Sequence, residues 1–196
     1  MSEVEPWAEE QLPTLQALVL ELLGVKDFTD DQLADVLRYL SDDETRKEVE
    51  TRPGQRLIRV YALHREPVRL DSTRVAVYHD PEGNTLFRHG YSRDHRPDLT
   101  QFKVMLGALD PMGMPIATLV VGGDEADDGL YVPTIERLRP VVGRRGRLYI
   151  GDNKMGALAT RAFIHASGDS YLVPLGQTGE VPALLASLLE QVWAKE

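Results

Sequence analysis

Cysteine is absent from the 196 residues, so disulfide bridges, thiolate metal sites and cysteine nucleophiles are excluded. Any metal ion must therefore be bound by oxygen or imidazole ligands. The five histidines do not have the spacing of a zinc site, and no serine stands in a nucleophile-elbow pattern. The basic turn at residues 143–147 lacks the lysine and hydroxyl residue of a Walker loop. Zinc hydrolase, serine hydrolase and NTPase functions are therefore unsupported.

Long apolar runs are absent as well. No segment approaches the roughly 20 residues that a membrane-spanning helix requires, and the acidic first residues do not show the basic-then-apolar order of a signal peptide. We therefore expect a cytoplasmic protein with no membrane partner. Hydrophobic residues make up 42% and charged residues 27% of the chain, which is typical of a globular protein with a packed core.

The formal net charge is -9, but the excess of acid is confined to the first quarter of the chain. Residues 1–50 contain 14 acidic and 4 basic side chains, a net of -10, whereas residues 51–196 contain 17 acidic and 18 basic side chains, a net of +1. Lysine and arginine supply most of the non-specific affinity for nucleic-acid phosphates. The charge therefore argues against phosphate contact by the first 50 residues only.

Helical periodicity dominates the beginning of the chain. Leucine and valine recur at three- and four-residue spacing over residues 11–24, which predicts a helix with one buried stripe. Thr29 is expected to cap a second helix that ends near Leu40, because Gln32 stands where a capping box requires it. The chain is therefore expected to begin with two short amphipathic helices.

A third, strongly charged helix is expected over residues 41–55. Pro53-Gly54 should break it, since neither residue favours a helix interior. We therefore expect an acidic helical segment at residues 1–55 and a second domain at residues 56–196.

The sequence of the second domain predicts strands first, and alternating helices and strands after them. Residues 68–78 and 85–88 are predicted to form a hairpin around a turn. Two further strands are predicted at residues 102–109 and 115–121. After them a helix is predicted at residues 130–141, a strand at 147–150, a helix at 157–164 and a last strand at 171–173. Three antiparallel strands followed by alternating helices and parallel strands form the mixed sheet of a ribonuclease-H-like α/β fold.

Two aspartates fall on strands that this topology makes neighbours. Asp71 lies within the first strand, where strand propensity disfavours aspartate, and Asp152 directly follows the strand at residues 147–150. Pairing of these strands would bring the two carboxylates within one strand spacing. Two such carboxylates can share divalent cations and activate a nucleophile at a phosphodiester. The alternatives are that Asp71 is a solvated strand residue and that Asp152 is a helix N-cap.

Three segments carry a resemblance to a known family. They are Leu-Asp-Ser-Thr at residues 70–73, Gly-Tyr-Ser-Arg-Asp-His-Arg-Pro-Asp-Leu at residues 90–99, and Tyr-Ile-Gly-Asp-Asn-Lys-Met at residues 149–155. In this order and spacing they resemble the catalytic region of bacterial insertion-sequence DDE transposases, and the middle segment is the most specific. The resemblance implies that Asp71, in an Asp-x-Thr motif, and Asp152, which begins the motif ending in Met155, are catalytic metal ligands.

The same resemblance implies an activity and its partners. Transposases of this kind use Mg²⁺ or Mn²⁺ to hydrolyse and join phosphodiesters, so double-stranded DNA at the transposon ends and the target would be the substrate, and a homodimer the active form. The third acid of the family is a glutamate on a helix well downstream. Neither Glu180 nor Glu190 is assigned to that role, so we expect a catalytic domain truncated on its C-terminal side.

The basic loop of the middle segment supplies candidate DNA contacts. The resemblance implies that Tyr91, Arg93, His95 and Arg96, together with Lys154 next to the second aspartate, hold backbone phosphates near the metal ions. Composition alone favours ion pairing within the loop instead, and Lys154 fits equally well as a surface lysine.

Two other functions remain open. One is a non-catalytic DNA-binding or dimerising transposase fragment, which would bind DNA without cleaving it. The other is an α/β binding module whose acidic helices recruit a protein and whose aspartates are structural. That module would not bind Mg²⁺.

Overall fold

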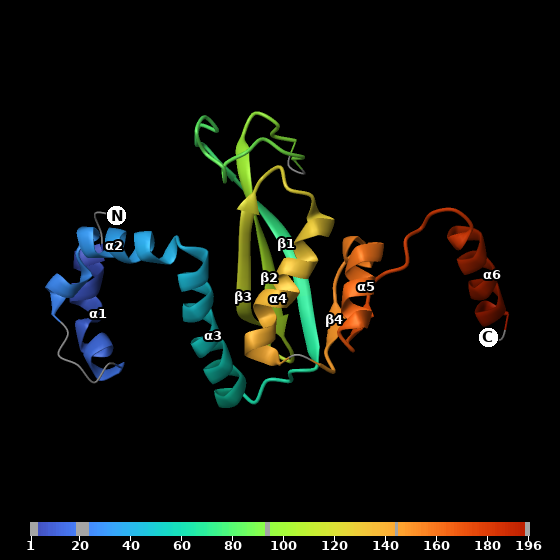
Figure 1. Cartoon of the computed structure of the whole chain (residues 1–196), viewed down its shortest axis with the longest axis horizontal. Coiled ribbons are helices and arrows are strands. Elements are labelled where there is room, and N and C mark those ends of the chain that lie inside the picture. Colours follow the sequence, from blue (N-terminus) through green and yellow to red (C-terminus); the bar gives the residue numbers. More distant parts are fainter. Residues whose placement is uncertain (1–3, 19–23, 93–94, 144, 195–196) are drawn as a thin grey trace. The chain divides into compact units, whose positions relative to one another are not determined.

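The computed structural model describes residues 4–18, 24–92, 95–143 and 145–194. The chain forms two compact units, residues 1–49 and residues 50–196. The division falls inside helix α3 (Asp43–Val60), which also contains the boundary predicted from the sequence at residue 55 (Figure 1).

The first unit contains α1 (Val4–Leu18), the short 3₁₀ helix η1 (Val25–Phe28) and α2 (Asp30–Leu40). Helix α1 begins before the predicted start at residue 11, and its predicted last turns, residues 19–23, lie outside the described part of the chain.

The predicted cap of α2 is confirmed. The Thr29 hydroxyl accepts a hydrogen bond from the backbone N–H of Gln32 at 3.3 Å. The apolar side chains of α2 are only partly covered: no residue of this helix, which is described throughout, is buried, and Val36 and Leu37 are about half exposed.

Helix α3 continues through Pro53 and Gly54, so the predicted break there is wrong. Gly54 is buried, and a Cβ atom on it would lie 2.9 Å from Cγ1 of Val141 and 3.4 Å from the carbonyl oxygen of Ile116. This close approach, which glycine permits, packs the helix tightly at the point of weakest propensity. Packing of the following turn also places Ile58 in the core.

The second unit is built on a five-stranded sheet in the order β3-β2-β1-β4-β5. The strands are β1 (Pro67–Val77), β2 (Thr100–Leu109), β3 (Met114–Gly122), β4 (Leu148–Ile150) and β5 (Ser170–Leu172). Strands β1, β2 and β3 are antiparallel neighbours, while β4 pairs parallel to β1 and β5 pairs parallel to β4. The predicted ribonuclease-H-like mixed sheet, preceded by a helical segment, is confirmed.

The predicted hairpin partner of the first strand is wrong. Strand β1 pairs with β2 along almost its whole length, whereas residues 85–88 contribute an isolated bridge between Arg88 and Gln101. Strand β2 is the better partner because it is long and lines the core with alternate side chains. The basic loop at residues 90–99 therefore lies before β2 rather than after a second strand.

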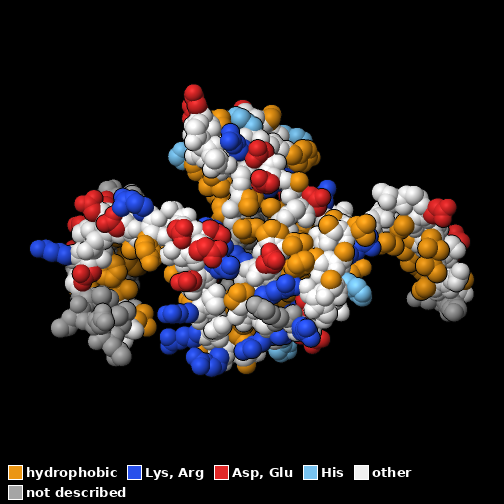
Figure 2. Space-filling view, viewed as in Figure 1, with side chains coloured by type: hydrophobic (Ala, Val, Ile, Leu, Met, Phe, Trp, Pro, Cys, Tyr) orange, Lys and Arg blue, Asp and Glu red, His pale blue; other side chains and the backbone are white. Residues whose placement is uncertain are grey.

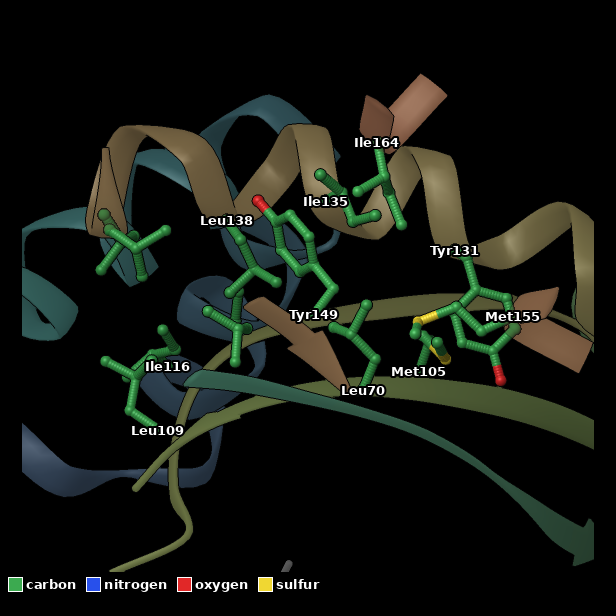
Figure 3. Close-up of a cluster of buried hydrophobic side chains, with 14 of the residues drawn as sticks. Leu70, Met105, Leu109, Ile116, Tyr131, Ile135, Leu138, Tyr149, Met155 and Ile164 are labelled. Carbon is green, nitrogen blue, oxygen red and sulfur yellow. The ribbon is translucent and has the colours of Figure 1, made fainter. Parts of the chain in front are cut away.

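Helices α4 (Tyr131–Val142) and α5 (Leu158–Ala166) follow β3 and β4. Their apolar side chains pack on one face of the sheet (Figure 3), in a cluster that includes Leu70, Met105, Ile135, Leu138, Tyr149 and Ile164. Two short 3₁₀ helices, η2 (Asp127–Leu130) and η3 (Asn153–Gly156), lead into α4 and α5 respectively.

A last helix, α6 (Val181–Trp193), contains Glu190. None of its residues, all of which are described, is buried. Across the described residues no helix is long and apolar enough to span a membrane.

Candidate functional site

Asp71 lies on the face of β1 that points away from the core. Val68 and Leu70 are buried at 0% and 2% exposure, whereas the alternating residues Arg69 and Asp71 are exposed. The Oδ1 atom of Asp71 accepts a hydrogen bond from the backbone N–H of Ser72 at 2.8 Å. Among the described residues no cationic side chain pairs with Asp71, so its charge is uncompensated.

Asp152 is held firmly just after β4. Its Oδ1 atom accepts hydrogen bonds from the hydroxyl of Tyr131 at 2.6 Å and from the backbone N–H of Lys154 at 2.8 Å. Asp152 is therefore the N-cap of η3, as one alternative predicted. Both bonds use the same oxygen atom. The cap and a metal-ligand role for Oδ2 are thus compatible.

Gly151 and Met155 explain the rest of the motif around Asp152. Met155 is fully buried, and a Cβ atom on Gly151 would lie 2.8 Å from its sulfur. A side chain at residue 151 would push Met155 out of the core and move the turn that carries Asp152. The backbone N–H of Gly151 also donates to the carbonyl oxygen of Leu172 at 3.2 Å. The glycine and the methionine therefore position the carboxylate between them.

The register of β1 and β4 brings together the segments that carry the two aspartates. Pro67 lies opposite Leu148, and Arg69, two residues before Asp71, lies opposite Ile150, two residues before Asp152. The pairing ends there, and Asp152 lies in the cap of η3. Adjacent strands are about 4.8 Å apart, so both aspartates closely follow the last paired residues of neighbouring strands.

Tyr131 at the start of α4 is a site residue that the sequence did not reveal. It is 1% exposed and points its hydroxyl at Asp152. Burial raises the pKa of this hydroxyl well above its usual range, and the hydrogen bond to Asp152 and the charges of Asp152, Asp71 and Asp127 raise it further. The tyrosine therefore stays protonated and acts as a donor amid three carboxylates. No spacing signal marks it, because a tyrosine at the start of a helix is usually a core residue.

Asp127 differs from the other two carboxylates because it is neutralised. It binds Arg74 at 2.9 Å and Lys103 at 2.7 Å, and all three side chains are at least four-fifths buried. Lys103 also donates to the backbone oxygen of Glu125. This group holds the beginning of η2, and hence Tyr131, against β1 and β2.

The Gly-Tyr motif before β2 is fixed by backbone packing. A Cβ atom on Gly90 would lie 2.3 Å from the carbonyl oxygen of Gly123, so only glycine fits there. The Gln101 side chain is buried and donates to the carbonyl oxygens of Tyr91 at 3.2 Å and of Gly123 at 3.1 Å. The ring of Tyr91 lies 5.5 Å from the guanidinium carbon of Arg74. The loop thus contacts the strand that carries Asp71.

Two of the three sequence motifs meet in a small pocket. Its volume is about 220 Å³, and it lies between β1 and the loop. The residues that line it are Ser72, Thr73, Arg74, Ala76, Ser92, Arg96, Leu99 and Gln101. The structure therefore brings the segment at residues 70–73 beside the segment at residues 90–99.

Of the candidate DNA-contacting residues in this loop that the structure describes, Arg96 forms an ion pair within the loop. Arg96 makes a two-pronged contact with Asp98, at 2.8 and 2.7 Å. Tyr91 is 76% exposed, and His95 is exposed with a left-handed backbone, φ 55°. Arg93 lies outside the described residues. The side chain of Lys154 is exposed next to Asp152.

Within the described ranges, no cluster of three or more histidine and carboxylate side chains is arranged to hold a metal ion. The described residues instead offer two candidate oxygen ligands, Asp71 on β1 and Asp152 just after β4. Such a pair suits Mg²⁺ or Mn²⁺ better than a softer metal.

Comparisons with known proteins gave structural neighbours only. No protein-family model matches the chain, and no curated protein matches it. The Mos1 transposase paired-end complex with left transposon end aligns with 67% of this chain at 15% identity and a TM-score of 0.37. The piggyBac transposase synaptic complex with hairpin DNA aligns with 88% at 16% identity and a TM-score of 0.40. The Mos1 mariner paired end complex with Mn aligns with 68% at 13% identity and a TM-score of 0.36.

The chain spans less than half of each of these proteins, namely 42%, 39% and 43% of their lengths in the same order. The fold assignment rests on the strand order and register of the chain itself.

Proposed function

We propose that this chain is a DNA transposase of the DDE type, with its metal-binding carboxylates on the ribonuclease-H-like unit. The observation that supports this most strongly is the parallel pairing of β1 with β4, whose last pair, Arg69 and Ile150, lies two residues before Asp71 and two residues before Asp152. The three motif segments add the resemblance of sequence. The reaction would be metal-dependent hydrolysis of a phosphodiester at the transposon end, followed by transfer of the freed strand to target DNA.

The carboxylate pair fits a divalent cation. Each aspartate has one oxygen engaged by protein donors, and the second oxygen of each accepts no hydrogen bond from the described residues. Bound there, Mg²⁺ or Mn²⁺ would activate the attacking oxygen and stabilise the leaving oxygen. Tyr131 and the Lys154 backbone would hold Asp152 in its ligating orientation.

Exposed side chains near the two aspartates suit a DNA strand. Tyr91, His95 and Arg96 of the loop beside β1, and Lys154 next to Asp152, would hold backbone phosphates of the transposon end. Arg93 is proposed with them from the sequence motif alone. Arg96 would exchange Asp98 for a phosphate, since exposed ion pairs are weak. The working form would be a homodimer that brings two DNA ends together.

Calorimetric titration with Mn²⁺ tests the pair directly. Asp71→Asn and Asp152→Asn should each weaken binding by tenfold or more, because each removes one of only two anionic ligands. Asp128→Asn is the matched control, since Asp128 is exposed and the charge change is the same. Absence of Mn²⁺ binding in the unaltered chain, or binding that survives both site substitutions, would contradict the metal-site proposal.

A non-catalytic transposase fragment is the second candidate. The observation in its favour is that the described residues offer two candidate ligands and no group of three. A cleavage assay on duplex DNA with Mn²⁺ separates the two functions. DNA binding without strand cleavage would select the fragment, and cleavage that Asp71→Asn abolishes would select the enzyme.

A further inference from the structure

A second concentration of charge lies at the other end of the parallel strands. An open groove of about 840 Å³ runs between the C-terminal half of α3, the segment that follows it, and the end of α4. Four arginines line it, namely Arg52, Arg56, Arg59 and Arg65. We call these four side chains and the Pro140–Gly143 wall opposite them the arginine groove.

Three of the arginines form one stripe on α3. Arg52, Arg56 and Arg59 stand at positions i, i+4 and i+7, which share a helix face. At 1.5 Å per residue the stripe covers roughly 10 Å of helix axis. All four arginines are exposed, and within the described residues none forms an ion pair or a side-chain hydrogen bond.

The groove is rigidly built. The Gln55 side chain donates to the carbonyl oxygen of Pro140 at 2.9 Å and ties α3 to the end of α4. Ala62, with a left-handed φ of 49°, turns the chain after α3, and the backbone N–H of Leu63 bonds back to Ile58 at 3.0 Å. Buried Leu63 and Ile58 anchor this turn in the core. The arginines therefore project from a fixed frame.

Charge distribution shows that the groove is a local feature. Residues 51–65 contain four arginines and no acidic residue, whereas residues 41–50 contain five acidic and two basic residues. Figure 2 shows basic side chains gathered over the C-terminal half of α3 and the neighbouring surface. Compensation of the helix dipole accounts for Arg59 in the last turn, but not for Arg52 two turns earlier. Four unpaired guanidinium groups repel each other unless an anion lies between them.

We propose that the arginine groove binds the phosphate backbone of double-stranded DNA at a site separate from the carboxylate pair. Planar guanidinium groups bind phosphate oxygens in two-pronged contacts. Duplex DNA carries one charge per roughly 1.7 Å of axis, so the stripe faces several phosphates at once. From Arg65 to Asp71 the extended chain covers roughly 20 Å, which is about six base pairs of duplex. The choice of DNA as the anion rests on the proposed function.

The test measures binding of a fluorescent duplex of about 30 base pairs as a function of salt. The variant Arg52→Gln/Arg56→Gln/Arg59→Gln should lower the slope of log affinity against log salt by about 2.7, since each lost phosphate contact removes about 0.9. Its affinity should fall by tenfold or more. The control Lys26→Gln/Arg38→Gln/Arg161→Gln removes the same charge from exposed positions outside the groove and should leave the slope nearly unchanged.

Two further arms make the result decisive. Replacement of the same three arginines by lysine should retain most of the slope, because the charges remain. The Mn²⁺ affinity of the glutamine variant should equal that of the unaltered chain, so a failure of the metal site is seen separately from a failure of the groove. Equal loss in groove and control variants, unchanged binding in the groove variant, or binding of polyglutamate in preference to DNA would overturn the proposal.

Discussion

The two ends of the β1–β4 pair carry opposite chemistry. At the carboxyl end Asp71 and Asp152 have no cationic partner among the described residues, and at the amino end four arginines have no acidic one. Farther along β1 than Asp71, the carboxylate of Asp127 is paired with both Arg74 and Lys103. Opposite charges that lie close together therefore form structural ion pairs, whereas charges kept about 20 Å apart stay available for ligands. Separation is what would let one end bind a cation and the other an anion.

The largest expected effect comes from breaking the buried ion pairs that Asp127 forms with Arg74 and Lys103. Asp127→Ala leaves Lys103, which is 4% exposed, without its carboxylate, and should lower the free energy of unfolding by about 3 kcal/mol or more. Urea denaturation followed by circular dichroism measures this. Asp128→Ala, in the same 3₁₀ helix but exposed, should change stability by less than about 0.5 kcal/mol. Similar losses in both variants would show that the ion pairs are not structural.

The role of Tyr131 sharpens the chemistry of the carboxyl end. Tyr131→Phe removes the donor at 2.6 Å from Asp152 and should weaken Mn²⁺ binding by about 10- to 100-fold, as loss of a residue that orients a metal ligand usually does. Calorimetric titration measures the change. Tyr149→Phe is the matched control, because Tyr149 is equally buried but does not bond to Asp152. Unchanged affinity in Tyr131→Phe would mean that the hydrogen bond is only structural.

Tyr149, on β4 nearer the amino end of the strands, should make the stability of the protein depend on pH. Burial, reinforced by the charge of Asp169, raises its pKa to about 12. Because the folded pKa lies above the unfolded value of 10, Tyr149 contributes stability below pH 10 that is lost as pH rises toward 12. At pH 11 the loss should be about 1 kcal/mol. Urea midpoints at pH 9 and pH 11 should therefore differ less in Tyr149→Phe than in the unaltered chain.

The smallest effect concerns the paired arginine of the loop. Asp98→Asn removes the acid that pairs with Arg96, so the charge of Arg96 would become more available to a phosphate. DNA affinity should rise about two- to fivefold, since exposed pairs are worth less than about 1 kcal/mol. The duplex-binding assay measures this, with Asp128→Asn as the control of equal charge. An equal gain in both variants would indicate a general charge effect rather than release of Arg96.

Hydrophobic periodicity was sufficient to predict the type and approximate bounds of several helices and strands in the α/β unit. The strands at residues 102–109 and 115–121 and the helix at residues 130–141 were predicted close to their observed bounds, because alternate burial and helical spacing leave a clear mark on a sequence. The partner of β1 was not predictable in the same way. Alternation shows that a segment is a strand, but the choice between residues 85–88 and β2 depends on which strand buries more apolar surface.

Tyr131 and the arginine groove escaped sequence reasoning for different reasons. Tyr131 reads as a core aromatic residue, and only its position above Asp152 makes its hydroxyl relevant. The stripe of Arg52, Arg56 and Arg59 straddles Pro53-Gly54, where the sequence favours a break. The stripe exists because α3 continues through that point.

The sequence by itself determined most of the element order of the α/β unit, apart from the strand predicted at residues 85–88, together with the two candidate aspartates and the concentration of acid in the first 50 residues, since periodicity, motif and charge are local properties. Tertiary structure decided which strands pair, including β1 with β4, and that α3 stays unbroken, because each depends on burial against residues far away in the chain. At Gly54 the deciding contacts are with Val141 and Ile116, and no local propensity at Pro53-Gly54 records them.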